Sequence, residues 1–193
     1  MIELVCLMGK SGTGKSTLAE EIYKQRAIKG LNTNIVKSYS SRPPRKDPRD
    51  WETHIFVTPE KYDEDLKHNR IMLNYLGVDD NGNSYHNWVS EDSFKENTMN
   101  IFVVDPKAYA ELFNNKEFLE NYKVYGFYLV LDEKIRKQRL LNRGSNYVAD
   151  EEHLEVKHIE NTAFSNIYMK EYTPEQLVKN ISEVYPILER TFD

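Results

Sequence analysis

The stretch that decides the fold is GKSGTGKS, Gly9 to Ser16. Residues 2–8 before it are mostly apolar and run up to a glycine, which predicts a short buried strand. Residues 16–30 after it carry apolar side chains at helical spacing and end at Gly30, which predicts a helix closed by a glycine. The pattern G-x-x-x-x-G-K-S between a strand and a helix is typical of a loop that binds the phosphates of a nucleotide.

The residue types of this loop suit phosphate chemistry. Glycines let the backbone curl so that successive N–H groups point at phosphate oxygens, and the helix that begins at Ser16 adds the positive end of its dipole. Lys15 reaches the β and γ phosphates in such loops, and the Ser16 hydroxyl ligates Mg²⁺. A glycine-rich turn that only joins a strand to a helix is the alternative, and the context argues against it. We therefore expect a loop that binds ATP through Gly9, Ser11, Gly12, Thr13, Gly14, Lys15, Ser16 and Thr17, with the three small polar residues Ser11, Thr13 and Thr17 as fillers.

Strands and helices alternate along most of the chain. Further strands are predicted at residues 33–40, 53–57, 99–105 and 124–131, and helices at 58–69, 106–113, 132–144, within 145–164, and at 173–192. The segment SRPPRKDPRD, residues 41–50, is a proline-rich loop, and residues 77–87 are a turn-rich loop with the hairpin signal DNG. The alternation favours an α/β fold with a parallel sheet and helices on both faces. Residues 38–100 interrupt the rhythm, so we interpret them as an inserted subdomain.

Bulk properties exclude several classes of protein. The 193 residues carry a net charge of −5, which disfavours a nucleic-acid partner. Cys6 is the one cysteine and sits in an apolar run, so no disulfide can form within the chain. There is no apolar run of membrane-spanning length and the start lacks a basic region, so we expect no membrane partner, no signal peptide and a cytoplasmic location. The oligomeric state is left open, a homodimer included.

Two arginine-rich stretches predict further anion sites. In SYSSRPPR, residues 38–45, the prolines stiffen the backbone that carries Arg42 and Arg45, whose guanidinium groups match phosphate in bidentate geometry. In the helix at 132–144, Arg136, Arg139 and Arg143 share one face and would neutralise charge on a phosphoryl group in transfer. A solvated basic loop and an ordinary amphipathic helix are the plainer alternatives.

Two anion sites favour a phosphoryl donor together with a phosphorylated acceptor, because a GTPase or a motor needs only one nucleotide site. We also find no N-K-x-D motif and no D-x-x-G switch after the second strand, which weakens the GTPase interpretation.

In order along nearly the whole chain, these motifs resemble the guanylate kinase family of nucleoside monophosphate kinases. The specific signal is GKSGTGKSTL together with SYSSRPPR, and HIFVTPEKYD, GNSY, IFVVD and RLLNRG add weaker matches. The resemblance implies a P-loop NTPase fold with an inserted NMP-binding subdomain and a lid. We take 1–37, 101–131 and 166–193 as the core, 38–100 as the acceptor-binding insert and 132–165 as the lid.

The resemblance also implies roles for single residues. Ser38, Arg42, Arg45 and Tyr85 would hold the acceptor's phosphate, with His54 at a position where the family commonly has a tyrosine. Asp105 would lie near the metal and the acceptor base, and Ser16 and Asp105 are the predicted metal-binding residues. Lys15, Arg139 and Arg143 would stabilise the phosphoryl group in transfer, with Arg136 among the ATP-binding residues.

The departures from the family concern the acceptor base. The family's guanine-reading glutamate falls on Leu73, which cannot accept hydrogen bonds from guanine, and Asn74 would replace it only after a slip of one residue. His86 stands where the family has a glycine, and an insertion of about three residues falls in VDDNG. The later lid arginine matches Lys157 or His158.

The sequence thus predicts an ATP- and Mg²⁺-dependent kinase of a nucleoside monophosphate. GMP or dGMP is the first expectation, and another nucleotide follows closely because the phosphate contacts are kept and the base contacts are not. A kinase of a sugar phosphate and a catalytically inactive binding module remain as alternatives.

Overall fold

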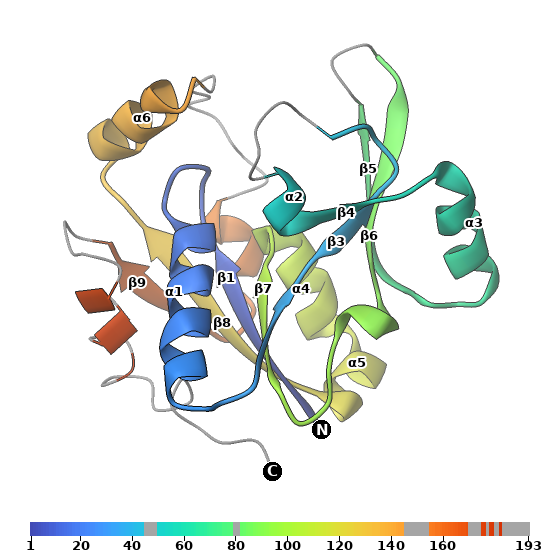
Figure 1. The fold of residues 1–193 in the computed structure, drawn as a ribbon, viewed down its shortest axis with the longest axis horizontal. Coiled ribbons are helices and arrows are strands. Elements are labelled where there is room, and N and C mark those ends of the chain that lie inside the picture. Colours follow the sequence, from blue (N-terminus) through green and yellow to red (C-terminus); the bar gives the residue numbers. More distant parts are fainter. Residues whose placement is uncertain are drawn as a thin grey trace. The chain divides into compact units, whose positions relative to one another are not determined.

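The computed structural model describes residues 1–44, 50–78, 82–144, 155–169, 175–176, 178–179 and 182. The chain forms two compact units (Figure 1). Unit 1 comprises Met1–Ile35 and Glu96–Asp193, and unit 2 comprises Val36–Lys95.

Unit 1 is built on a five-stranded sheet in the order β2-β7-β1-β8-β9. These strands are β2 (Thr33–Val36), β7 (Met99–Val103), β1 (Ile2–Met8), β8 (Tyr122–Val130) and β9 (Phe164–Tyr168). β1 lies in the middle and pairs in parallel with β7 and β8, and β8 pairs in parallel with β9. A central parallel strand is covered on both faces, which explains why every side chain from Leu4 to Met8 is buried.

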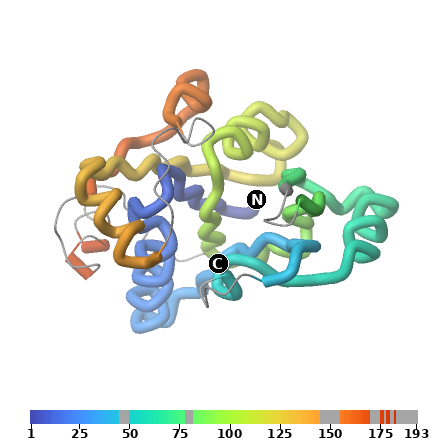
Figure 2. Tube along the Cα trace, turned by 90° about the horizontal axis from the view of Figure 1, so that it is seen from above, coloured from blue at the N-terminus to red at the C-terminus, as the bar shows by residue number. Residues whose placement is uncertain are grey.

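Helices cover both faces of this sheet, as the alternation of strands and helices predicted (Figure 2). Helix α1 (Lys15–Ile28) packs its buried residues Leu18 and Ile22 against Val5 and Leu7 of the central strand. On the opposite face lie α4 (Pro106–Asn114), α5 (Lys116–Asn121) and the short 3₁₀ helix η3 (Val156–Ile159). Helix α6 (Glu133–Asn142) follows β8.

Unit 2 has a sheet of its own in the order β4-β3-β6-β5. Its strands are β3 (Ser38–Ser40), β4 (His54–Phe56), β5 (Ile71–Val78) and β6 (Ser84–Ser90), joined by α2 (Asp50–Thr53), α3 (Pro59–Lys67) and the 3₁₀ turn η1 (Glu91–Ser93). β3 and β4 are parallel, whereas β6 is antiparallel to both β3 and β5.

Asp65 fixes α3 to the sheet of unit 2. Its buried carboxylate accepts from Trp88 Nε1 and Ser90 Oγ of β6, both at 3.0 Å. Lys61 Nζ at 2.7 Å and an Arg70 guanidinium nitrogen at 2.8 Å complete the set. Burial alone would raise the pKa of Asp65, but these hydrogen bonds and charges lower it below its usual value.

Several predictions of secondary structure are confirmed and others are wrong. The strand at 2–8, the helix after Gly14 and the helix after Thr58 are confirmed. The hairpin signal DNG lies largely outside the described residues, and the antiparallel pairing of β5 with β6 on either side of it agrees with a hairpin. The single strand predicted at 33–40 is two strands in different sheets, because the chain leaves the first sheet after Val36.

The predicted loop at 77–87 is shorter than expected, since Gly77 and Val78 complete β5 and β6 begins at Ser84. The segment before Phe164 holds a 3₁₀ turn and not the expected α-helix, in the part that the structure describes, and β9 follows it. Of the helix predicted at 173–192, only residues 175–176, 178–179 and 182 are described, and these are helical. Among the described residues, no helix combines the length and apolar character needed to cross a membrane.

Candidate functional site

The loop Gly9–Lys15 begins where the central strand β1 ends. The chain passes from β7 on one side of β1 to β8 on the other, so the order of strands reverses beside this strand. The crevice outside the carboxyl ends of parallel strands at such a reversal is where ligands bind in open α/β sheets. The sequence GKSGTGKS therefore lies at the edge of the sheet where a nucleotide site is expected.

The backbone of the loop has the shape that its glycines allow. Gly9, Gly12 and Gly14 have φ values of 136°, 84° and 101°, in the region that residues with a Cβ rarely adopt. The buried Thr13 donates its hydroxyl to the Lys10 carbonyl at 2.8 Å and closes the turn. These contacts curl the loop ahead of α1, whose N-cap is Gly14.

The side chain of Lys15 folds back over this loop. Its Nζ donates to the carbonyl oxygens of Gly9 at 2.7 Å and Lys10 at 3.1 Å. The ammonium group is thus held inside the curl of the loop, among the backbone groups that would surround a phosphate. Ser16 stands in the first turn of α1, half-buried, and Thr17 beside it is exposed.

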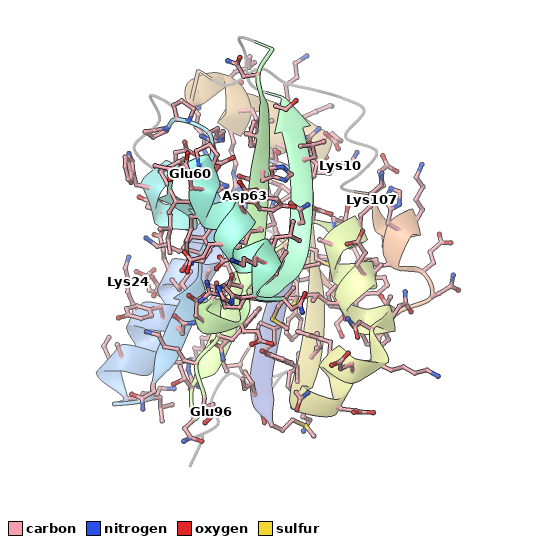
Figure 3. All side chains as sticks on the ribbon, turned by 90° about the vertical axis from the view of Figure 1, so that its right-hand side faces the viewer. Lys10, Lys24, Glu60, Asp63, Glu96 and Lys107 are labelled. Atoms are coloured by element: carbon pink, nitrogen blue, oxygen red, sulfur yellow. The ribbon has the colours of Figure 1, made fainter. Side chains whose placement is uncertain are left out.

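Helix α6 holds the loop from outside through Arg136. This arginine is fully buried, donates from Nη1 to the Ser11 carbonyl at 3.1 Å, and pairs through Nε with Glu133 at 2.7 Å. Burial would raise the pKa of Glu133, but Arg136 and Lys10 lower it below its usual value. Lys10, labelled in Figure 3, lies 3.5 Å from Glu133 and 3.4 Å from Glu155. The predicted ATP-binding residue Arg136 therefore contacts the loop's backbone and shapes it.

The second predicted arginine of α6 is close to the loop as well. A Cβ added at Gly14 would lie 3.7 Å from Nη1 of Arg139, so this guanidinium stands beside the start of α1. Arg143 is the exposed C-cap of α6. Lys157 and His158, the candidates for a later lid arginine, lie on η3.

Asp105 follows β7 at the same edge of the sheet. The register Leu7 to Val103 and the hydrogen bond from Val104 N to the Leu7 carbonyl place the end of β7 beside the end of β1. The carboxylate of Asp105 caps α4 by accepting from Ala108 N at 2.9 Å through one of its oxygens.

A hydroxyl and a carboxylate oxygen are hard ligands that suit Mg²⁺, which is usually held by one or two side chains plus substrate phosphates. Ser16 and Asp105 therefore fit such an ion by the chemistry of their donors. Among the described residues there is no group of three or more His, Cys, Asp or Glu side chains that could hold a metal without such help.

The sheet of unit 2 has two faces with different partners. Directly paired residues share a face and successive residues alternate. The α3 face carries Tyr39, Asn74, Leu76, His86 and Trp88, and Tyr62 of α3 stacks on His86 with ring centroids 3.8 Å apart. The other, which we call the Tyr85 face, carries Ser38, Ser40, His54, Phe56, Leu73, Tyr75, Tyr85 and Asn87.

Arg42 lies over the Tyr85 face. Its guanidinium carbon is 5.2 Å from the Phe56 ring centroid and 5.8 Å from that of Tyr85. The guanidinium is buried and makes a bidentate ion pair with the buried Asp50, at 2.7 and 2.6 Å. Hydrogen bonding to Asp50, more than the proximity of Tyr85, raises the pKa of Arg42 above its usual value against the opposing effect of burial.

Four of the residues predicted to bind the acceptor's phosphate therefore belong to one region of unit 2. Ser38 and His54 are direct partners in the β3–β4 ladder, and Arg42 stands over Tyr85. His54 also approaches Asp50, with Nδ1 3.5 Å from Oδ1. Gly77 is directly opposite Tyr85, and a Cβ there would overlap the Tyr85 ring, so the glycine leaves room for that side chain. Arg45 lies outside the described residues.

The idea that Asn74 replaces the missing glutamate by a slip of one residue is wrong in its geometry. Leu73 is on the Tyr85 face, whereas Asn74 and His86 are on the α3 face. There Asn74 Nδ2 donates to Tyr62 Oη at 2.9 Å, and Asn74 Oδ1 lies 3.1 Å from His86 Nδ1. A slip of one residue moves a side chain to the other face of a strand.

The structure adds residues that the sequence analysis missed. Asp50 lies in the segment predicted as a loop but is the first residue of α2, and an acidic residue eight positions after Arg42 could have suggested a partner for that arginine. Ser40 and Asn87 are paired across β3 and β6, and their buried atoms Oγ and Oδ1 have no hydrogen-bond partner in the part of the chain that the structure describes. Strand alternation from Tyr85 would have placed Asn87 on the same face.

Comparisons with known proteins were made on the sequence and on the fold. No family model matches the chain. Over 72 residues, the sequence is 31% identical to the guanylate kinase of Porphyromonas gingivalis strain W83, and this stretch is 37% of each protein. The chain thus matches little more than a third of the length of that relative. The crystal structure of guanylate kinase from Anaplasma phagocytophilum superposes with a TM-score of 0.57 at 15% identity, over 98% of this chain and 84% of that one.

A parallel five-stranded sheet flanked by helices, with a glycine-rich loop after its central strand, defines a P-loop NTPase fold. Both matched proteins are guanylate kinases, which agrees with the resemblance that the motifs predicted.

Proposed function

We propose that this protein is a kinase that transfers the γ-phosphoryl group of ATP to a nucleoside monophosphate, with GMP or dGMP as the first candidate. The observation that carries the proposal is that two separate sets of residues have the chemistry to bind anions. One is the curled loop of unit 1 with Lys15, and the other is the cluster of Arg42 and Tyr85 in unit 2. A nucleotide hydrolase would need only the first.

In this proposal the chemistry is placement and neutralisation of charge. The loop's N–H groups and Lys15 would hold the donor's phosphates, and Arg139 and Arg143 of the predicted lid, 132–165, would neutralise charge on the phosphoryl group. Ser38, Arg42, His54 and Tyr85 would orient the acceptor's phosphate for in-line attack. Mg²⁺, which Ser16 and Asp105 would help to hold, supplies further neutralisation when bound. No covalent intermediate with the protein is needed.

A coupled assay of ADP formation with all common ribo- and deoxyribonucleoside monophosphates tests the proposal. Turnover with at least one is expected, and turnover with none would refute it. Lys15→Ala should lower kcat by about 10²-fold or more, because it removes a preorganised charge from the phosphoryl group in transfer. The matched control is Lys24→Ala, an exposed lysine on the same helix (Figure 3), which should leave kcat unchanged.

A second candidate is a kinase of a sugar phosphate on the same fold. It is favoured by Leu73, an apolar and buried side chain where a guanine-reading carboxylate was expected. Thermal shift with sugar phosphates and nucleoside monophosphates separates the two candidates, since a ligand that binds the native state raises Tm. A shift with nucleotides alone rejects the sugar phosphate, and tight nucleotide binding without turnover would instead support an inactive binding module.

A further inference from the structure

The buried guanidinium of Arg42 uses only part of its hydrogen-bonding capacity. An arginine has five N–H donors in a planar fork. Nη1 donates to Asp50 Oδ2 at 2.7 Å and to the Pro43 carbonyl at 3.0 Å, and Nη2 donates to Asp50 Oδ1 at 2.6 Å. Nε is buried and has no hydrogen-bond partner among the residues that the structure describes. Asp50 thus occupies the end of the fork, and Nε lies on the adjacent edge, which it shares with the second N–H of Nη2.

An unpartnered buried donor requires an explanation, because it has lost its hydrogen bonds to water without replacement. The Nε–Nη2 edge of an arginine presents two parallel N–H groups, which match two oxygens of a phosphate as well as the end of the fork does. Tyr85, whose ring lies 5.8 Å from the guanidinium carbon, stands on the same side of the sheet. The donors left over by Asp50 are therefore the ones suited to an oxyanion.

Asp50 has two conceivable effects on a phosphate at this place. As a competitor, it would have to leave Arg42 when the phosphate arrives. That would break the bidentate ion pair of a carboxylate that is 8% exposed, and breaking a buried ion pair is strongly unfavourable. As a fixed partner, it keeps the guanidinium in one orientation and leaves the other edge to the ligand. Asp50 also lies 3.5 Å from His54 Nδ1, so it contacts two of the predicted acceptor-binding residues at once.

We propose that Asp50 is a positioning residue of the acceptor site: it holds the end of the Arg42 fork so that the Nε–Nη2 edge binds a phosphate oxyanion. The identity of that oxyanion as the acceptor's phosphate rests on the proposed function.

Steady-state kinetics of Asp50→Asn distinguish the two roles of Asp50. A positioning role predicts that KM for the acceptor rises about 10- to 100-fold, because charge-assisted hydrogen bonds to the phosphate are lost, while KM for ATP stays unchanged. A competing role predicts the opposite sign, a lower acceptor KM, since a negative charge beside the phosphate is removed. An acceptor KM that is unchanged or lower overturns the proposal.

Asp65→Asn is the matched control. Asp65 is also a buried aspartate of unit 2 paired with cations, but its partner Trp88 belongs to the α3 face. It should lower stability and leave the acceptor KM within about two-fold of wild type, with both variants assayed where circular dichroism shows them folded. If Asp50→Asn does not fold, Asp50→Glu replaces it. Glutamate keeps the charge but displaces the carboxylate, so the acceptor KM should rise by a smaller factor, and no rise overturns the proposal.

A spectroscopic arm separates this inference from the proposed function. The Nε–H resonance of Arg42, assigned by its loss in Arg42→Lys, should shift in the wild type when GMP or inorganic phosphate is added. In Asp50→Asn the same shift should require at least about ten-fold more ligand. A shift that depends on Asp50 without turnover of any monophosphate would refute the kinase and leave the oxyanion site. Turnover with no shift, or with a shift that does not depend on Asp50, would refute the site and leave the kinase.

Discussion

Replacing Asp65 by asparagine should destabilise unit 2 by an amount that the structure allows us to work out. Trp88 and Ser90 both donate to Oδ2, so an amide oxygen placed there keeps both hydrogen bonds. Lys61 and Arg70 both meet Oδ1, where the new NH₂ group would face two cations. Two charge-assisted hydrogen bonds at about 1.5–3 kcal/mol each are lost.

Solvent reduces this sum, since the side chains of Lys61 and Arg70 are 26% and 36% exposed and can regain water. We therefore expect a loss of about 2–4 kcal/mol in the free energy of unfolding. For a chain of this size, each kcal/mol lowers Tm by about 2–4 °C, which gives a fall of about 4–16 °C. Urea unfolding followed by circular dichroism measures the free energy, and calorimetry measures Tm.

Asp63→Asn provides the control on the same helix. Asp63 is exposed (Figure 3), so its substitution should stay within about 0.5 kcal/mol of wild type. The pKa of Asp65 is lowered in the folded protein, so its contribution is present above the unfolded value of about 3.9 and is lost as pH falls through the folded value. The difference between wild type and Asp65→Asn should therefore shrink in acid below about pH 4. A difference under about 0.5 kcal/mol at pH 7 would refute the reasoning.

Three further predictions concern the site and the core. Leu73→Glu should raise kcat/KM for GMP relative to other monophosphates by about ten-fold or more, because a carboxylate can accept from guanine; an unchanged ratio in the substrate panel would mean that the base is not read there. Gly77→Ala should raise the acceptor KM by about three- to ten-fold without changing the ATP KM, because the new Cβ displaces Tyr85. An acceptor KM equal to that of the wild type would exclude Tyr85 from the acceptor site. Burial raises the pKa of the Cys6 thiol, so a thiol reagent at neutral pH should label Cys6 only after denaturation. Mass spectrometry measures the labelling, and rapid labelling of the native protein would contradict the burial of this thiol.

The sequence predicted the parts of the fold that local patterns control. The run at residues 2–8 is apolar because β1 is buried on both faces, and the loop after it needs glycines for its positive φ values. The break at Lys37 could not be predicted, because β2 and β3 are both short and β-like, and only their pairing partners in two different sheets divide them. β5 was not predicted for a related reason. Leu73 and Leu76 lie on opposite faces of the strand and are both apolar, so the sequence shows no alternation of apolar and polar residues there.

The candidate site was predictable where a motif fixes it and unpredictable where two distant residues meet. GKSGTGKS gave the place of Lys15, but nothing in the sequence of α6 says that Arg136 holds the loop through the Ser11 carbonyl. Likewise, the pairing of Arg42 with Asp50 depends on a tertiary contact. Which face of β5 carries Leu73 follows from the register of the sheet. A count along the sequence contains no register, so it allowed Asn74 to be considered as the replacement for the guanine-reading glutamate, although Asn74 lies on the other face.

The position of β1 between its two neighbours also has a consequence in time. Leu4 pairs with Asn100 on one side and Val124 on the other, so the strand that carries the loop has no partner until much later parts of the chain have been made. Between the synthesis of GKSGTGKS and that of β8 the ribosome adds about 100 residues, which takes about 5–20 s. A nascent chain therefore holds the complete predicted phosphate-binding sequence long before it holds the folded loop. Nucleotide binding should appear abruptly as β8 emerges, which makes the nucleotide a reporter of completed assembly of this sheet.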